Sequence, residues 1–105
     1  MDLAKRKFGL MVSTAPDHRN LETALGLSRA ALDRGADVYL YLIDDAVAAV
    51  EDPRLQTLAG RGLKLFVCAY GCQKRRQPLS DKATNCGLVV LTDLINGTDR
   101  FLALN

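Results

Sequence analysis

The chain has 105 residues, of which 49% are hydrophobic, 25% are charged and 6% are aromatic. This length and composition predict one folded domain over residues 1–105, and they exclude a multidomain enzyme and a disordered chain. The 14 basic and 12 acidic residues leave a net charge of +2. Because the basic excess is so small, the composition does not predict a nucleic-acid partner. The function must therefore be sought in local features.

The start of the chain bears on cellular location. A basic run, residues 5–7, precedes a first apolar stretch, residues 8–12, in the order seen in signal peptides. The stretch is shorter than the roughly seven apolar residues of a secretion signal and the roughly 20 of a membrane span. We therefore expect a cytoplasmic protein with no membrane partner. In that reducing compartment the three cysteines are expected to be free thiols.

The first third of the chain predicts a strand followed by a helix. Residues 8–12 contain no polar interruption, which is typical of a central parallel strand covered on both faces. Small and apolar residues then recur at helical spacing over residues 21–32. Asp17 or Asn20 is predicted to cap this helix, and Gly35 to end it.

The middle of the chain predicts two strands and two short helices. The strands are residues 38–43 and 63–68, and the helices are residues 46–50 and 53–59. Asp44 and Asp45 are predicted to cap the first of these helices. Pro53 suits the first turn of the second, and Gly60 or Gly62 its end.

The last third of the chain predicts the remaining elements. They are a helical turn at 71–77, a polar loop at 80–85, a fourth strand at 87–90, a short helix at 92–96 capped by Thr92, and a last strand at 100–104. Five strands separated by helices predict an α/β fold, a three-layer α/β/α domain with a mainly parallel sheet.

In such sheets, ligands bind outside the carboxyl ends of the strands. Ser13, Thr14 and His18 follow the first strand and form a candidate substrate rim, where backbone N–H groups could hold an anion. This loop lacks the glycines of a phosphate-binding or dinucleotide site. His18 could orient a substrate or assist proton transfer, but a solvated loop histidine is the more common case.

Cys68 is the strongest candidate for chemistry. It ends a predicted buried strand, before a helical start and three cations, Lys74, Arg75 and Arg76. Helix N-terminal N–H groups and nearby cations stabilise a thiolate, so the pKa of Cys68 is expected below about 8.5. The pattern equally allows Cys68 to be a small buried residue without chemistry.

The other two cysteines have different expected roles. Cys72 lies four residues after Cys68 and is a candidate resolving thiol, second sulfur acceptor or bystander. Cys86 precedes the predicted fourth strand, so it is expected at the opposite end of the sheet, in packing. A zinc site formed by the three cysteines and His18 is disfavoured, because no second paired motif is present. Asp44 and Asp45 could bind a divalent ion, but helix capping explains them more simply.

Several segments in order resemble the DsrE/DsrF-like proteins (DsrEFH superfamily) of sulfur oxidation and sulfur relay. The strand and Ser/Thr-Pro loop at 7–20, the strand at 36–44, the strand at 62–68 that ends in the family's cysteine, the basic residues 74–76 and the closing pattern at 91–102 carry this resemblance. It implies a DsrE-like domain of flavodoxin-like appearance.

The resemblance also implies a function. It is that of a cytoplasmic sulfur carrier or sulfurtransferase component, in which Cys68 holds sulfane sulfur as a persulfide and passes it to a partner thiol. Sulfur donor and acceptor proteins would be the partners, and a homo-oligomer, trimer or hexamer, is implied. No cofactor or metal is expected, and whether the protein is an enzyme or only a carrier stays open. The alternative is a non-enzymatic regulatory or interaction module that binds a small molecule or anion at the carboxyl rim.

Overall fold

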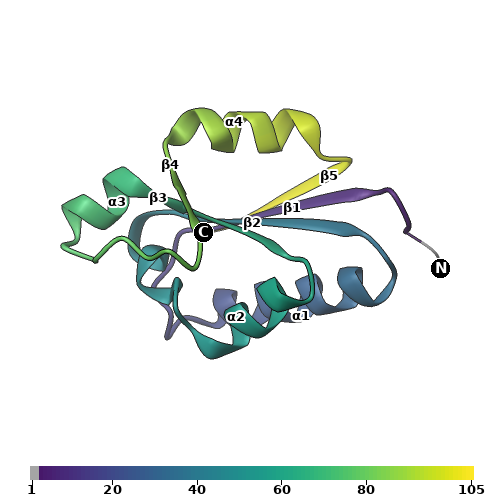
Figure 1. Ribbon diagram of the computed structural model, residues 1–105, viewed down its shortest axis with the longest axis horizontal. Helices are drawn as coiled ribbons and strands as arrows, with labels where there is room; N and C mark the ends of the chain where they lie inside the picture. Colours follow the sequence, from purple (N-terminus) through teal and green to yellow (C-terminus); the bar gives the residue numbers. More distant parts are fainter. Residues whose placement is uncertain (1–2) are drawn as a thin grey trace.

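The structure, a computed structural model, describes residues 3–105. It has three layers (Figure 1): helix α4 (Leu88–Gly97) covers one face of a sheet, and helices α1 (Arg19–Asp33) and α2 (Pro53–Gly60) cover the other. The sheet contains β1 (Lys7–Val12), β2 (Asp37–Leu42), β3 (Lys64–Cys68), β4 (Thr84–Cys86) and β5 (Arg100–Leu104); the 3-10 helix η1 (Asp44–Ala49) and helix α3 (Ala69–Lys74) complete the fold. The predicted α/β class is confirmed.

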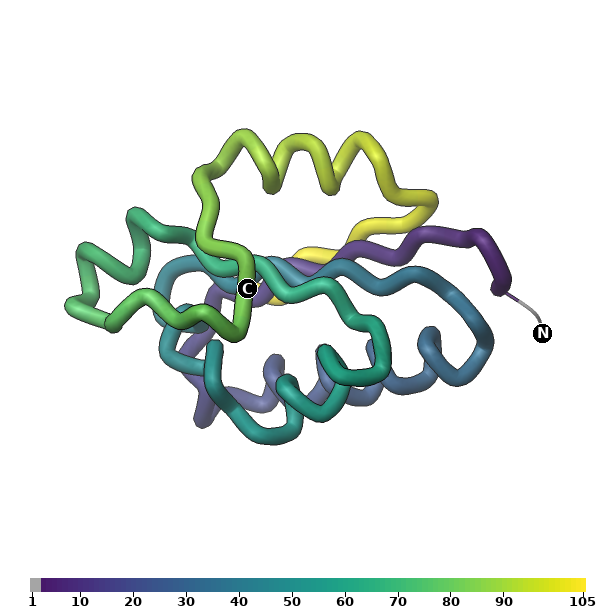
Figure 2. Tube along the Cα trace, in the orientation of Figure 1, coloured from purple at the N-terminus to yellow at the C-terminus, as the bar shows by residue number. Residues whose placement is uncertain are grey.

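The sheet has the strand order β4-β3-β2-β1-β5, and every neighbouring pair is parallel. The first four strands advance in one direction, and β5 then pairs with the other side of β1. Crossovers between parallel strands are right-handed, so this reversal of direction places α4 on the face opposite α1 and α2. Figure 2 shows the chain of α4 running back across the sheet from β4 to β5. All five strands therefore end at one carboxyl edge.

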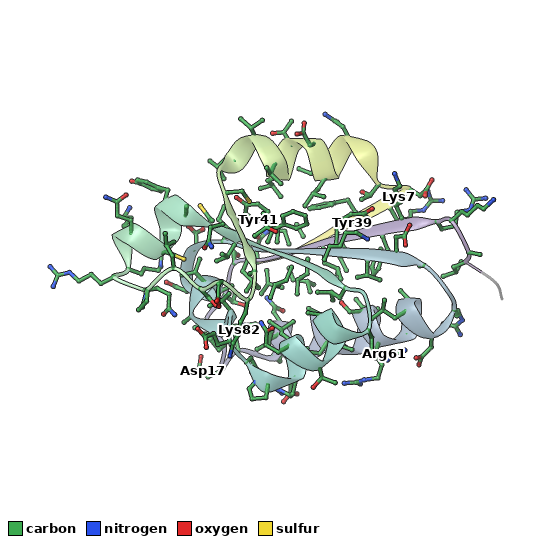
Figure 3. All side chains as sticks on the ribbon, viewed as in Figure 1. Lys7, Asp17, Tyr39, Tyr41, Arg61 and Lys82 are labelled. Atoms are coloured by element: carbon green, nitrogen blue, oxygen red, sulfur yellow. The ribbon has the colours of Figure 1, made fainter. Side chains whose placement is uncertain are left out.

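One face of the sheet is turned toward α4 and carries the aromatic residues of β2. Tyr39 and Tyr41 lie on this side of the sheet (Figure 3), and Tyr41 is fully buried. Gly9 of β1 is in register with Phe101 of β5. A Cβ atom on Gly9 would lie 2.6 Å from Cδ2 of Phe101, so the ring packs directly on the bare backbone of β1.

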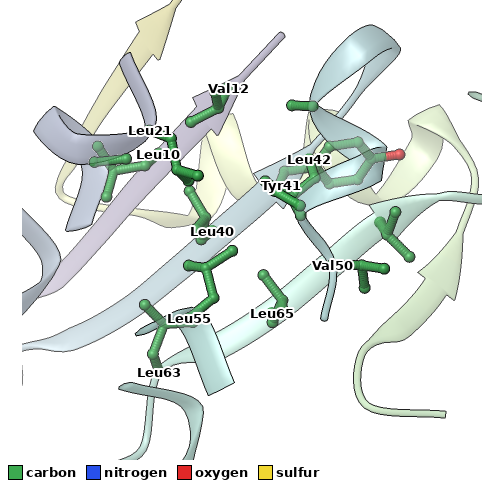
Figure 4. Close-up of a cluster of buried hydrophobic side chains, with 14 of the residues drawn as sticks. Leu10, Val12, Leu21, Leu40, Tyr41, Leu42, Val50, Leu55, Leu63 and Leu65 are labelled. Atoms are coloured by element: carbon green, nitrogen blue, oxygen red, sulfur yellow. The ribbon is translucent and has the colours of Figure 1, made fainter. Parts of the chain in front are cut away.

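The main core lies on the other face, against α1 and α2. Along the three central strands, a leucine or valine recurs at every second position, and this spacing places these side chains on one face of the sheet. The fully or nearly fully buried strand residues there are Leu10, Val12, Val38, Leu40, Leu42, Leu65 and Val67. Leu21 of α1 and Leu55 of α2 pack in the same cluster (Figure 4).

The predicted fourth strand is wrong, and the helix after it begins earlier than predicted. The strand is β4 at 84–86 instead of 87–90, and α4 already begins at Leu88, with Gly87 as its N-cap. Thr92 lies inside α4, where its hydroxyl donates to the carbonyl of Leu88. Val89 and Val90 favour a strand in isolation, but packing of an apolar helix across the sheet outweighs that preference.

Two predicted caps are also wrong. His18, instead of Asp17 or Asn20, caps α1, because its Nδ1 atom accepts the backbone N–H of Asn20 at 3.1 Å. Asp44 and Asp45 lie in the first turn of η1, and no side chain caps that helix. Within residues 3–105, no helix combines the length and apolar character needed to cross a membrane.

Candidate functional site

The carboxyl edge of the sheet brings two cysteines together. Cys68, the last residue of β3, is in register with Cys86, the last residue of β4. Paired residues of neighbouring strands project to the same face of a sheet, so both side chains lie on the α4 side. The prediction that Cys86 sits at the opposite end is wrong, because β4 ends at Cys86 instead of beginning after it.

Cys68 joins a strand to a helix. It is the N-cap of α3, and its sulfur accepts the backbone N–H of Gly71 at 3.3 Å. Gly71 packs closely on η1, since a Cβ atom there would lie 3.3 Å from Cγ1 of Val47. Only 2% of Cys68 is exposed. The local fold thus holds a buried sulfur with a backbone N–H donor directed at it.

Tyr41 is a site residue that the sequence analysis missed. Its hydroxyl donates to the carbonyl of Gly87 at 3.0 Å, and it also interacts with the thiols of Cys68 and Cys86. Burial is the main cause that raises the pKa of Tyr41 far above its usual value, and the two thiols raise this pKa further. The hydroxyl therefore stays protonated and can act as a donor. In the sequence, Tyr41 looks like any other apolar strand residue.

Cys72 and Cys86 are weaker acids than ordinary cysteines. Burial raises the pKa of Cys72, which is fully buried in α3, and the neighbouring Cys68 raises it further. Burial also raises the pKa of Cys86, while its hydrogen bond with Tyr41 acts in the opposite direction. The Cys86 thiol lies 3.8 Å from the carbonyl oxygen of Val67. All three cysteines are free.

The three predicted anion-stabilising cations differ in their surroundings. Arg75 donates from Nε to Asp45 Oδ1 at 2.8 Å and lies 3.9 Å from Asp44 Oδ1. It also interacts electrostatically with Cys68. The side chains of Lys74 and Arg76 are exposed, and within residues 3–105 neither forms a hydrogen bond or ion pair with Cys68. Arg75 is therefore the cation with a direct electrostatic influence on the site.

The predicted rim loop lies at the same edge but is separate from Cys68. It follows β1, two strands away, which corresponds to about 10 Å. Ser13 donates to Asn105 Oδ1 at 3.0 Å, and His18 caps α1. The Thr14 hydroxyl is buried without a hydrogen-bond partner in the described part of the chain.

A groove borders the site along α3. It has a volume of about 500 Å³ and is lined by Ala69, Tyr70, Gln73, Gln77 and Leu79. Tyr70 is 67% exposed and Leu79 is 63% exposed, so apolar surface adjoins Cys68. A second pocket, of about 560 Å³, lies at the amino ends of β1 and β5, among Lys7, Arg34 and Arg100. It belongs to the end of the sheet away from the thiols.

The grouping of the metal-binding side chains bears on the disfavoured zinc site. Among the described residues, 3–105, no three or more His, Cys, Asp or Glu side chains are grouped so that they could hold a metal ion. Cys68 interacts with Cys72 on one side and with Cys86 and Tyr41 on the other. The site is thus a chain of neighbouring sulfur and hydroxyl groups with Cys68 in its middle.

No protein-family model matches the chain, and no curated protein matches its sequence. Among solved structures, the chain is similar to the crystal structure of the ychN protein from E. coli, with a TM-score of 0.81 and 22% sequence identity. The match covers 94% of this chain and 99% of the ychN chain. The fold is therefore shared with ychN. At this identity the comparison carries the fold alone.

Proposed function

We propose that the protein is a cytoplasmic sulfur carrier or sulfurtransferase component that holds sulfane sulfur as a persulfide on Cys68. The position of Cys68 carries the proposal: it stands at the carboxyl edge of a parallel sheet, with its sulfur accepting the N–H of Gly71. The resemblance of residues 62–68 to the strand that ends in the cysteine of the DsrE/DsrF-like proteins supports it, as does the α/β fold shared with ychN over 94% of the chain.

The proposed chemistry is thiol exchange without a net change in oxidation state. The Cys68 thiolate attacks the outer sulfur of a donor persulfide, a new S–S bond forms on Cys68, and the donor leaves as a thiolate. An acceptor thiolate later attacks the outer sulfur of the Cys68 persulfide and releases the Cys68 thiolate. The N–H of Gly71 and the charge of Arg75 stabilise that leaving thiolate.

Access to Cys68 requires a movement of its cover. Only 2% of the residue is exposed, and α3, which begins directly after it, has six residues. Helices this short are marginally stable without tertiary support. A donor or acceptor protein that docks on exposed Tyr70 and Leu79, in the groove along α3, could displace this helix and reach the sulfur.

The test is sulfur loading. The reduced protein is incubated with polysulfide, freed of excess reagent and weighed as an intact chain. Wild type should gain the mass of sulfur, Cys68→Ser should gain much less, and Cys72→Ser, as the matched control, should load like wild type. Absence of added sulfur on wild type, or equal addition to Cys68→Ser, overturns the proposal.

The second candidate is a non-enzymatic module that binds a small anion at the carboxyl rim. The buried Thr14 hydroxyl, which has no hydrogen-bond partner among residues 3–105, favours it. This function predicts that Cys68→Ser binds its partner normally and that Thr14→Val does not. Loss of partner binding in Cys68→Ser would exclude it.

A further inference from the structure

We propose that Cys86 is the second thiol of the site, and that sulfane sulfur passes between Cys68 and Cys86 across the edge of the sheet. The proposal rests on the persulfide function proposed for Cys68. Its own observation is the register of the two strands, which places the two cysteines directly opposite each other at the ends of β3 and β4.

The spacing of the strands suits this transfer. Neighbouring strands lie about 4.8 Å apart, and cysteines whose Cα atoms lie roughly 4.4–6.8 Å apart are close enough for their sulfurs to bond. A persulfide on Cys68 adds one S–S bond of about 2 Å. The outer sulfur on Cys68 therefore reaches the neighbourhood of the Cys86 thiol without a movement of the sheet.

Exposure distinguishes Cys86 from the other two thiols. Cys68 is 2% exposed and Cys72 is fully buried. Cys86 is half-buried and lies on β4, an edge strand, between the exposed residues Asn85 and Gly87. It is thus the thiol that an acceptor can approach while α3 still covers Cys68. Cys72, the sequence-based candidate for the second thiol, lacks this access.

The transfer balances without an oxidant. The Cys86 thiolate attacks the outer sulfur of the Cys68 persulfide, the S–S bond on Cys68 breaks, and a persulfide forms on Cys86. The proton that Cys86 gave up passes to the Cys68 thiolate. Tyr41 interacts with both thiols, so its single hydroxyl proton, which is donated to the Gly87 carbonyl in this structure, can be donated instead to the sulfur that carries the negative charge. We assign Tyr41 as a positioning residue for this step.

The kinetic test compares three proteins: wild type, Cys86→Ser and Cys72→Ser as the matched control. Each is loaded with polysulfide, freed of excess, and mixed with dithiothreitol while the intact mass is followed. Cys86→Ser should load Cys68 fully but release the sulfur about tenfold more slowly, because it loses the intramolecular acceptor. Cys72→Ser should release it at the wild-type rate. Equal release rates for wild type and Cys86→Ser overturn the proposal.

A second readout locates the sulfur. Trypsin cleaves after Lys64, Lys74, Lys82 and Arg100, so Cys68 and Cys72 fall in one peptide and Cys86 in another. After brief loading and alkylation, we expect added sulfur on both peptides of Cys72→Ser, and little on the Cys86 peptide when Cys68 is replaced by Ser as well, because direct loading of Cys86 would persist in that double variant. Sulfur confined to the Cys68 peptide overturns the proposal, and so does a Cys68–Cys86 disulfide with release of hydrosulfide, which would show attack on the inner sulfur.

These outcomes separate the two proposals. Absence of sulfur on Cys68 in every variant counts against the persulfide function itself, whereas a loaded Cys68 with no role for Cys86 counts against this inference alone. Thermal unfolding of each variant separates slowed transfer from misfolding. If Cys86→Ser fails to fold, Cys86→Ala replaces it in both readouts.

Discussion

Burial and hydrogen bonding have opposing effects on the ionisation of the side chains at the carboxyl edge. Burial of Tyr41, Cys72 and Cys86 favours their neutral forms. A donor directed at sulfur acts in the opposite direction, and hydrogen bonding from Tyr41 lowers the pKa of Cys86 in this way. Burial and hydrogen bonding thus act against each other on the pKa of the Cys86 thiol.

Replacement of Tyr41 by Phe tests its place in the site. The variant loses the hydrogen bond to Gly87, so we expect the free energy of unfolding to fall by about 1 kcal/mol. The pKa of Cys86 should rise, since hydrogen bonding from Tyr41 lowers it. Urea unfolding and the pH dependence of Cys86 alkylation measure the two effects. Tyr39→Phe is the control, and an unchanged alkylation profile in Tyr41→Phe would contradict the assignment.

The buried acids also predict a loss of stability in alkali. In the unfolded chain Cys72 and Cys86 ionise near their ordinary pKa of 9.0 and Tyr41 near 10.0, whereas in the fold all three pKa values are raised. Above about pH 9 the unfolded state thus binds fewer protons than the folded state. The free energy of unfolding should fall with rising pH, by up to about 1.4 kcal/mol per pH unit for each group.

Urea unfolding at pH values from about 8 to 11 measures this slope. Tyr41→Phe removes one of the three groups. Above the ordinary pKa of tyrosine, the free energy of unfolding of this variant should therefore fall less steeply with pH than that of wild type. Stability that stays constant over this range would contradict the burial of these acids.

Among the elements, β1 and β5 depend on a contact that only glycine permits. Phe101 occupies the space beside Gly9 where a side chain would lie. This contact anchors β5, an edge strand whose single neighbour is β1. Together with Tyr39 and Tyr41, which lie on the same side of the sheet, Phe101 fills the layer between the sheet and α4.

Gly9→Ala should therefore destabilise the protein. The added methyl group would stand 2.6 Å from the Phe101 ring, and we expect a loss of about 1–3 kcal/mol in the free energy of unfolding. Gly26→Ala is the matched control, because Gly26 is exposed in α1 with no atom within 4 Å of the added Cβ. That control should gain about 0.5–1 kcal/mol. Chemical denaturation of both variants measures the difference, and equal effects would contradict it.

At the scale of the whole molecule, the two faces of the sheet are unequally covered. Two helices pack on one face and α4 alone on the other. The outer side of α4 exposes Leu88, Val89 and Ile95, which are 55%, 74% and 49% accessible. Exposed apolar surface of this kind is typical of contact regions between proteins.

We expect this surface to be covered in a homo-oligomer. Light scattering of the wild type at micromolar concentration should give a mass above that of one chain, and Val89→Asp should lower it, because a buried unpaired charge opposes association. Thr23→Asp, at an exposed position of α1 on the opposite face of the sheet, is the control. A monomeric wild type would contradict the prediction.

The sequence by itself determined most of the strands, the α/β class and the position of Cys68. Continuous apolar runs such as residues 8–12 and 63–68 suit strands buried on both faces. Proline and glycine between these runs indicate where helices begin and end. These are local signals, and an apolar run that ends in a cysteine places that residue at the carboxyl edge in any parallel sheet.

Only the tertiary structure decided which groups surround that cysteine. Residues 87–90 carry strand-forming side chains, yet the need to cover the sheet made them helix, and this moved Cys86 to the end of β4 beside Cys68. Likewise Arg75 binds Asp45, and Tyr41 contacts both thiols. Strand order and register bring together residues that lie far apart in the chain, so no local sequence pattern predicts these contacts. Of the three cysteines, the strand register brings two, Cys68 and Cys86, together at the edge of the sheet.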